Sequence, residues 1–537
     1  MTKLTIKSLL FLVLFPVSLF ALSPEPFDVT EFTILHTSDI HAHLMAFDGP
    51  SGNAVGGYAR IKQYKESLEK KGREVLMLSS GDIFQGTFFY RFFQGIPDIE
   101  FMNQTGYAAM TLGNHEFDNG QERLAEALSH ARFPILAANI RFKKIPQLQA
   151  RITPYTFVKV GKTSKTGRTA KIAIIGLCPE ELKTIVQPVF VNDFDVVDAA
   201  ETLRHYLPEI KKARPDMIIL LSHLGWEREL QLFEEFPELD AVLGGHTHLL
   251  TDPPAVVMGK RGHRFMSQSG EWGQHVTRYD ISFYRNSSRK IEVNAAGQVA
   301  MSDKLEQDAV MADRIQKLWE QIQEKVIAPV AKAAVWLNGE RTHVRNVETN
   351  LGNLMADCFA AMVPSDIALI NGGGIRSSIA TGTITIGDCL NVLPFDNYLV
   401  RLTMTGETLK KVFEQVAAQI DTAGGFGGFL QVSEGVKVNY NNPQPLRSFK
   451  GAPIDDNQLY TVTTIDFLAA GGNGLTAFTE ALKAESTGLM TADMFMKYLS
   501  RHHTVAPSVE GRIKGKDVPL KVKMPKGMVK GVPRPRW

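Results

Sequence analysis

The sequence has few cysteines and almost no imbalance of charge. Its 537 residues include three cysteines, Cys178, Cys358 and Cys389, and no Cys-x-x-Cys pair. Three cysteines exclude a disulfide framework, and we expect at least one to be a buried free thiol. Fifty-nine Lys and Arg residues against 57 Asp and Glu residues leave a net charge of +2. This balance gives no support to general binding of nucleic acid or of a membrane surface.

Long apolar runs are also scarce. The one strongly apolar run, residues 9–21, follows Lys3 and Lys7 and is too short to span a bilayer. This pattern is typical of a secretory signal peptide over residues 1–21, with an uncleaved anchor as the alternative. We therefore predict a periplasmic or secreted protein with no membrane association after signal cleavage.

Short β-rich runs alternate with amphipathic helical patterns between residues 32 and 255. The predicted strands are residues 32–36, 75–79, 172–176, 217–221 and 241–244, and the predicted helices are 58–71, 121–130 and 199–213. This alternation predicts a layered α/β domain with its site at the strand ends. A long helical pattern at residues 303–330 then leads to a second α/β region, with predicted strands at 366–370 and 460–464.

Polar clusters directly follow five of these strands or short apolar runs. They contain Asp39 with His41, Asp82, Asn114 with His115, His223, and His246 with His248. Imidazole and carboxylate ligands without thiols suit Zn, Mn, Fe or Co better than Mg or Ca. A single cluster of this kind is usually structural, but five in one domain predict a metal site. Two neighbouring ions need about three to four ligands each, ideally with a bridging carboxylate.

The motifs at residues 34–41, 80–86, 113–118 and 244–248 resemble, in order and spacing, those of the 5′-nucleotidase / UDP-sugar hydrolase family. The Gly-Asn-His-Glu-Phe-Asp motif at 113–118 is the most specific of them. The resemblance implies two divalent ions (Zn, Mn or Co) and a bridging carboxylate. The implied ligands are Asp39, His41 and His248 for one ion, Asn114, His223 and His246 for the other, and Asp82 as the bridge.

The same resemblance implies catalytic roles for His115 and Asp118. A protonated His115, held by the Asp118 carboxylate, would stabilise charge on the phosphoryl group or leaving group while a metal-activated water attacks. The alternative is that His115 only orients neighbouring ligands and that Asp118 caps a loop.

The resemblance continues past residue 330, which makes it more specific. Motifs at 340–345, 349–353, 371–376, 393–397 and 467–474 look like the family's C-terminal substrate domain. They imply three arginines that clamp phosphate, two rings that sandwich a base and an asparagine at the base edge: Arg341, Arg345, Arg376, Phe395, Phe467 and Asn397. Without the resemblance, a Phe after Leu-Pro is more often a core residue and scattered arginines are more often surface residues.

One position departs from the family pattern. Asn473, six residues after Phe467, replaces an Asp whose carboxylate accepts hydrogen bonds from ribose hydroxyls. An amide oxygen also accepts, but without charge assistance. We therefore expect weaker recognition of ribose and less discrimination against 2′-deoxy substrates.

Together these features predict an α/β protein with two domains. A signal peptide (1–21) precedes a four-layer αββα metallophosphatase domain (22–302), a linking helix (303–330), a C-terminal α/β substrate-binding domain (331–515) and a basic tail (516–537). The last residues, 521–537, are rich in Lys, Arg, Pro and Gly and are expected to fray.

The predicted function is that of an exported two-metal phosphohydrolase which releases inorganic phosphate from nucleoside 5′-phosphates. Nucleoside di- and triphosphates, UDP-sugars and 2′,3′-cyclic nucleotides are further candidate substrates, and no nucleic-acid or membrane partner is expected. One alternative is a thiosulfohydrolase-like relative, against which the arginine and phenylalanine sets argue. Another is a non-catalytic nucleotide-binding protein on the same fold.

Overall fold

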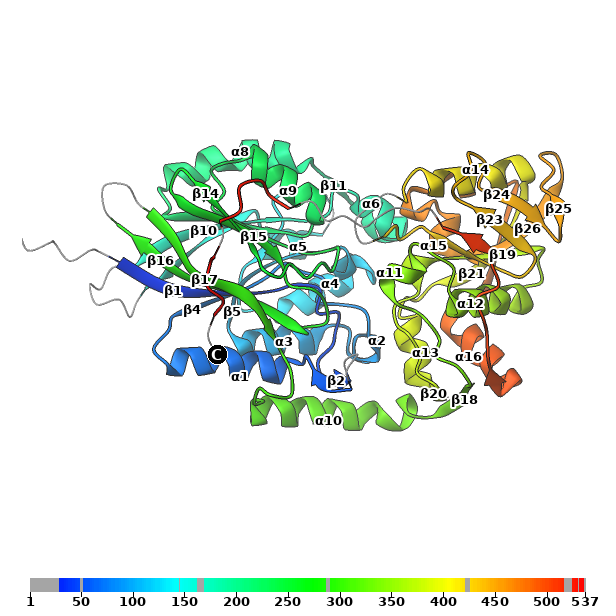
Figure 1. The fold of residues 1–537 in the computed structure, drawn as a ribbon, viewed down its shortest axis with the longest axis horizontal. Coiled ribbons are helices and arrows are strands. Elements are labelled where there is room, and N and C mark those ends of the chain that lie inside the picture. Colours follow the sequence, from blue (N-terminus) through cyan, green and yellow to red (C-terminus); the bar gives the residue numbers. More distant parts are fainter. Residues whose placement is uncertain are drawn as a thin grey trace, which may run out of the picture.

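The computed structural model describes residues 29–48, 52–143, 145–161, 169–285, 290–420, 425–515, 524–529 and 531–535. The predicted signal peptide lies outside these residues. None of the helices within them is long and apolar enough to cross a membrane. The chain forms two domains that lie side by side, with the long helix α10 (Ala309–Val326) running beneath both (Figure 1).

The first domain is built on one strongly curved mixed sheet of 13 strands. In spatial order the strands are β8 (Ile152–Thr153), β6 (Ile135–Leu136), β5 (Tyr107–Thr111), β4 (Val75–Ser79), β1 (Val29–Thr37), β16 (His275–Tyr284), β17 (Lys290–Ala300), β15 (Gly262–Gln268), β13 (Ala241–Gly244), β12 (Met217–Ser222), β10 (Ala170–Leu177) and β9 (Tyr155–Val160), with β14 (Ala255–Gly259) paired to β15. The sheet folds over so that β5 contacts β10 and β12.

Helices cover both outer faces of the folded sheet. In Figure 1, α1 (Tyr58–Lys70) and α3 (Ile96–Thr105) lie below it, and α8 (Ala199–Lys212) and α9 (Trp226–Glu235) lie above it. The central strands are buried on both faces, which is why they read as continuous apolar runs. The predicted α/β layering is therefore confirmed.

The second domain has a five-stranded sheet at its centre. Its strand order is β22 (Leu430–Val432), β19 (Ile367–Asn371), β26 (Leu459–Ile465), β21 (Tyr398–Thr405) and β27 (Lys483–Met490). Helices α12 (Asn350–Met362), α14 (Gly406–Ala417) and α16 (Thr491–His502) pack around a separate hydrophobic core. Cys178, Cys358 and Cys389 are all buried and free.

Helix α10 is shorter than the predicted range 303–330. It begins at Ala309 because the Asp308 side chain accepts a hydrogen bond from Met311 N and so caps the first turn. It ends before Pro329, which starts β18 (Pro329–Ala333) and disfavours helical backbone in the residue before it. The helix packs on α1 at one end and on α13 (Ile386–Val392) of the second domain at the other.

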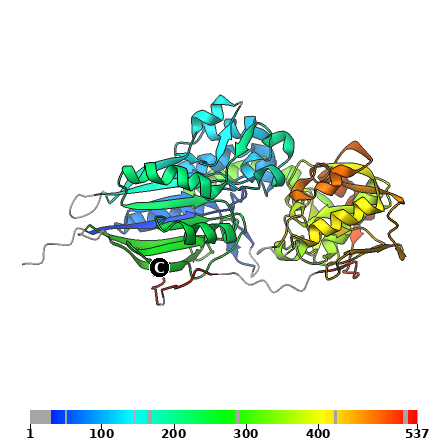
Figure 2. The ribbon, with the colours of Figure 1, turned by 90° about the horizontal axis from the view of Figure 1, so that it is seen from above.

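Residues 524–529 and 531–535 lie against the first domain, so the expectation of fraying is wrong for these described residues. These residues, here called the strap, run along the first domain (Figure 2). Val529 N donates to Val256 O at 2.7 Å, and Ala296 N donates to Pro533 O at 2.9 Å. Met528 and Val529 also pack against the apolar clusters on the two faces of the sheet. The edge of β14 supplies unpaired backbone groups and apolar surface, which composition alone does not reveal.

Deletion of residues 516–537 is expected to destabilise the neighbourhood of β14 by about 2–4 kcal/mol, because half-buried Met and Val side chains and two backbone hydrogen bonds are lost. Backbone amides of β14 should exchange with solvent faster, as measured by hydrogen exchange, while those of β26 in the second domain serve as the internal reference. Lys526→Ala, which changes an exposed strap residue, should leave both unchanged. Equal exchange of β14 in the truncated and full-length chains would contradict a stabilising strap.

Candidate active site and metal centre

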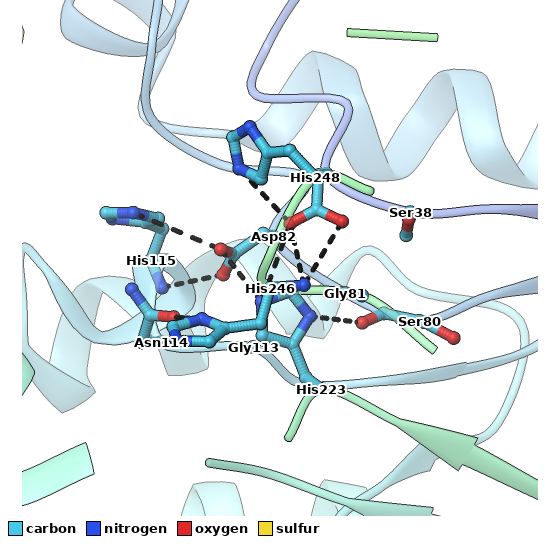
Figure 3. A network of polar contacts seen from close by, with 12 residues as sticks. Ser38, Ser80, Gly81, Asp82, Gly113, Asn114, His115, His223, His246 and His248 are labelled. Atoms are coloured by element: carbon cyan, nitrogen blue, oxygen red, sulfur yellow. Dashed lines mark hydrogen bonds and ion pairs between the residues drawn. The ribbon is translucent and has the colours of Figure 1, made fainter. Parts of the chain in front are cut away.

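Loops at the carboxyl ends of parallel strands bring the five polar clusters together. Strands β1, β4 and β5 pair in parallel in one half of the sheet, and β10, β12 and β13 pair in parallel in the other. Since the two halves face each other, their strand ends share one rim. Figure 3 shows His115, His223, His246 and His248 arranged around Asp82.

Three of the predicted ligands form a first group. Nε2 of His41 lies 3.0 Å from Nε2 of His248, and Nε2 of His248 lies 3.4 Å from Oδ1 of Asp39. One ligand atom from each of the three residues lies within 4.8 Å of the other two. All three side chains are buried or nearly so.

A second group adjoins the first. Oδ2 of Asp82 lies 2.9 Å from Nε2 of His223, and Nδ1 of His246 lies 3.0 Å from Oδ1 of Asn114. Oδ2 of Asp82 is also 4.0 Å from Nε2 of His41. Asp82 therefore faces both groups, and all seven predicted ligands lie in one place.

Each of the four imidazoles has one nitrogen held by an acceptor and the other aimed at the centre. Nδ1 of His41 faces Phe84 O at 3.1 Å, and Nδ1 of His223 faces Ser80 O at 2.5 Å. Nδ1 of His248 contacts Glu271, and Nε2 of His246 lies 3.4 Å from a carboxylate oxygen of Glu181. These acceptors fix the tautomer that leaves a lone pair on the inward nitrogen, as metal-ligating histidines require.

The centre of the site leaves no room for larger side chains. A Cβ on Gly113 would lie 2.2 Å from Oδ1 of Asp82, and one on Gly245 would lie 2.9 Å from Nδ1 of His223. Nε2 of His223 is buried, and no described residue meets it with hydrogen-bond geometry. Burial lowers the pKa of His223, but Asp82 and Asp39 outweigh it and raise that pKa to about 10. The two carboxylates therefore favour positive charge at this inward nitrogen, which a divalent cation would supply.

The backbone of the site is strained at the ligands themselves. Asp39, His41, Asp82, His246 and His248 have φ values of 53°, 51°, 50°, 77° and 59°. Side-chain-bearing residues rarely adopt this left-handed region, and each instance costs about 1–3 kcal/mol. Surrounding contacts must therefore hold these loops in place.

Glu116, which the sequence analysis did not single out, supplies such contacts. Its buried carboxylate accepts backbone hydrogen bonds from Asp82 N, Ile83 N and Gly113 N at 3.0, 2.8 and 2.6 Å. It therefore joins the two loops that carry Asp82 and Asn114. Burial, with the Asp82 charge, raises the pKa of Glu116 to about 7. Its place inside the 113–118 motif was the available signal, whereas no local pattern marks Glu181 or Glu271.

His115 lies at the edge of the second group. Its Nδ1 is 2.5 Å from Oδ2 of Asp118, and its Nε2 is 3.9 Å from Oδ2 of Asp82. The ring of Phe395, from the second domain, stacks on it with centroids 5.6 Å apart and an interplanar angle of 20°. The imidazole therefore lies between the ligand groups and the second domain.

The three predicted clamp arginines approach the site from the second domain. Nη2 of Arg341 donates to His246 O at 3.0 Å, and Nη2 of Arg376 lies 3.4 Å from Nε2 of His41. Burial, together with the charge of Arg376, lowers the pKa of Arg341 to about 10. Arg345 is half-buried, and desolvation and the other two arginines lower its pKa. Cations held this close to one another favour an anionic ligand between them.

A cavity of about 1040 Å³ opens between the two domains beside this cluster. Phe395, Asn397, Phe467 and Asn473 line it, so the structure brings all four predicted nucleoside-binding residues to one cavity. Oδ1 of Asn473 accepts a hydrogen bond from Asn371 Nδ2 at 3.0 Å. One wall belongs to the first domain and includes Gln187, which the sequence analysis did not identify.

Comparison with known proteins agrees with this geometry. Residues 32–250 match the calcineurin-like phosphoesterase family model, and residues 327–480 match the model of the 5′-nucleotidase C-terminal domain. The chain is 30% identical to snake venom 5′-nucleotidase of Crotalus adamanteus, over 90% of this chain and 88% of that protein. It is 31% identical to the trifunctional nucleotide phosphoesterase YfkN of Bacillus subtilis, over 92% of this chain but 35% of that longer protein.

Among solved structures, a 5′-nucleotidase precursor from Thermus thermophilus superimposes with a TM-score of 0.83 at 31% identity. The match covers 91% of this chain and all of that one. Both domains and their relative arrangement therefore have a solved counterpart.

Asp82→Asn is expected to weaken the binding of at least one divalent ion by about 10²-fold or more, because the amide keeps the shape but loses the charge that both ligand groups share. Metal analysis after equilibration with Zn²⁺ or Mn²⁺ should show fewer bound equivalents than in the wild type. Asp48→Asn makes the same charge change at an exposed carboxylate and should bind normally. Two full equivalents in Asp82→Asn would show that Asp82 does not bridge.

Proposed function

The chain belongs to the 5′-nucleotidase family of metal-dependent phosphoesterases, and from this membership we propose that it releases inorganic phosphate from nucleoside 5′-phosphates with two divalent ions. The observation that carries the proposal is the placement of three half-buried arginines beside two groups of metal-type ligands, at a cavity lined by two phenylalanines. The arginines suit a phosphate, the histidines and carboxylates suit metal ions, and the phenylalanines suit a nucleobase.

We assign Asp39, His41 and His248 to one ion, Asn114, His223 and His246 to the other, and Asp82 to both. Two divalent cations bound there would supply Lewis acidity, which lowers the pKa of water and offsets phosphoryl charge. The identity of the ions, Zn, Mn or Co, remains part of the proposal. Glu181 and Glu271 keep the His246 and His248 rings in the orientation that binding needs.

The remaining residues bind and orient the substrate. Arg341, Arg345 and Arg376 hold the phosphate oxygens, and His115, fixed by Asp118, donates a hydrogen bond or proton where charge develops. Phe395 and Phe467 stack on the base, with Asn397 at its edge and Asn473 beside the sugar.

Nucleoside di- and triphosphates, UDP-sugars and 2′,3′-cyclic nucleotides belong to the same proposal as additional substrates. So do export to the periplasm or the cell exterior, removal of residues 1–21, and the division into domains 22–302 and 331–515 around the linker 303–330, with the basic tail 516–537. The fact that supports export is the pattern of basic and apolar residues in 1–21.

The deciding experiment measures phosphate release from a panel of nucleotides, ribose 5-phosphate and p-nitrophenyl phosphate after loading with each divalent metal. We expect nucleoside 5′-phosphates to give the highest kcat/KM, chelation to abolish turnover and added metal to restore it. Turnover of p-nitrophenyl phosphate without any preference for nucleotides would overturn the substrate assignment. Absence of turnover in every metal-loaded form would favour a non-catalytic binding protein.

The His115→Ala and Phe395→Ala substitutions should affect different kinetic constants. His115→Ala is expected to lower kcat about 10²–10⁴-fold, because its charge matters most as the phosphoryl group transfers. Phe395→Ala should mainly raise KM, since stacking is similar in the ground and transition states. Steady-state kinetics on a good nucleotide substrate separate the two effects, and His130→Ala, at a distant exposed imidazole, is the control. An intact kcat in His115→Ala would remove it from the catalytic residues.

Asn473→Asp is expected to improve kcat/KM for ribonucleoside 5′-phosphates about 3–10-fold relative to their 2′-deoxy forms, because a carboxylate accepts hydrogen bonds from ribose hydroxyls more strongly than an amide does. Paired assays with a ribonucleotide and its 2′-deoxy analogue give the ratio directly. Asn441→Asp, on an exposed loop, should leave the ratio unchanged. If Asn473→Asp does the same, Asn473 does not contact the sugar.

A further inference from the structure

Part of the wall that the first domain contributes to the cavity is anchored by buried side chains. It follows β10 and consists of α6 (Leu182–Ile185), Gln187 and α7 (Pro188–Val191). Leu182 and Val186 are buried, and Pro188 restricts Gln187 to the extended backbone that it adopts. Helix α6 also packs against the 3₁₀ turn Gly472–Gly474 of the second domain, which contains Asn473. Gln187 is therefore held at the boundary between the domains.

Gln187 reaches across this boundary to the second domain. Its Nε2 donates to Oδ1 of Asn397 at 3.0 Å, and Asp466 of the second domain lines the same cavity. Asn397 is almost fully buried, and its backbone O is occupied by Thr491 N at 2.9 Å. The side chain of Asn397 is thus held at its oxygen end by a residue of the opposite domain.

The hydrogen bond between Gln187 and Asn397 sets the orientation of both amides. In an amide only the nitrogen donates and only the oxygen accepts, so Gln187 presents its nitrogen to the second domain. The same nitrogen faces Asn397, so Asn397 must turn its oxygen toward Gln187. The Nδ2 hydrogens of Asn397 are then left for a ligand in the cavity.

We infer that Gln187 is a specificity-determining residue that acts through Asn397. It makes Asn397 a hydrogen-bond donor to an acceptor on the edge of the nucleobase, and it does so only while the two domains are apposed. The inference rests on the proposed function, since it takes the occupant of the cavity to be a nucleoside 5′-phosphate. It adds a first-domain residue to the base-binding site and joins recognition of the base to apposition of the domains.

The test compares a nucleoside 5′-phosphate with ribose 5-phosphate, which lacks the base. Gln187→Ala is expected to raise KM for the nucleotide about 3–10-fold, the effect of one hydrogen bond, with little change in kcat. Its kinetics on ribose 5-phosphate, its bound metal and its melting temperature should match those of the wild type. Thr184→Ala is the matched control, because Thr184 lines the same wall and its hydroxyl bonds only Glu181 O among the described residues.

A double-mutant cycle with Asn397→Ala shows whether Gln187 acts through Asn397. If it does, adding Gln187→Ala to Asn397→Ala changes KM no further. Additive effects, or an equal loss on ribose 5-phosphate, would overturn the inference and leave the proposed function standing. A wild type that shows no preference for nucleotides over ribose 5-phosphate would overturn the proposed function and this inference together.

Discussion

The buried carboxylate of Glu116 is the interaction on which the site most depends. Five loops carry the ligands of the two groups, and several ligands have left-handed backbone that the chain would not adopt unaided. By accepting hydrogen bonds from the amides of Asp82, Ile83 and Gly113, Glu116 fixes the loop after β4 against the loop after β5. The desolvation of this carboxylate is offset by those amides. The position of Asp82, and hence the geometry that both ligand groups share, follows from this arrangement.

Much of the fold could be predicted because local pattern and tertiary structure agree. The runs at 75–79 and 241–244 are apolar throughout, and they are strands buried on both faces. The ligand set could be found because parallel strands end at a common rim, so residues after separate strands converge. His115 and Asp118 were identifiable because both belong to the Gly-Asn-His-Glu-Phe-Asp motif at 113–118, whose resemblance to the family implied their roles.

The features that could not be predicted depend on contacts between residues far apart in the sequence, which no local pattern encodes. Glu271 supports His248 only because the segment after β15 passes behind that ring. Gln187 and Asn397 are 210 residues apart along the chain, and they meet because the two domains are apposed. The strap has the composition of a free tail, yet Val529 pairs with the edge of β14. In each case the partner is set by tertiary placement and not by spacing.

Because the strap contacts the first domain, the chain connects the two domains twice. Helix α10 is the first connection between them. In the second connection, Gly515 O accepts a hydrogen bond from Asn441 Nδ2 in the second domain, and Met524 packs on the first domain. Gly515 and Met524 are nine positions apart along the chain. Nine residues reach about 30 Å at most, whatever path they take. Any swing that separates the arginines from the metal ligands must therefore keep these two points within that radius or peel the strap from β14. The amplitude of opening is limited by a length of polypeptide, and a single cut within residues 516–523 would remove that limit.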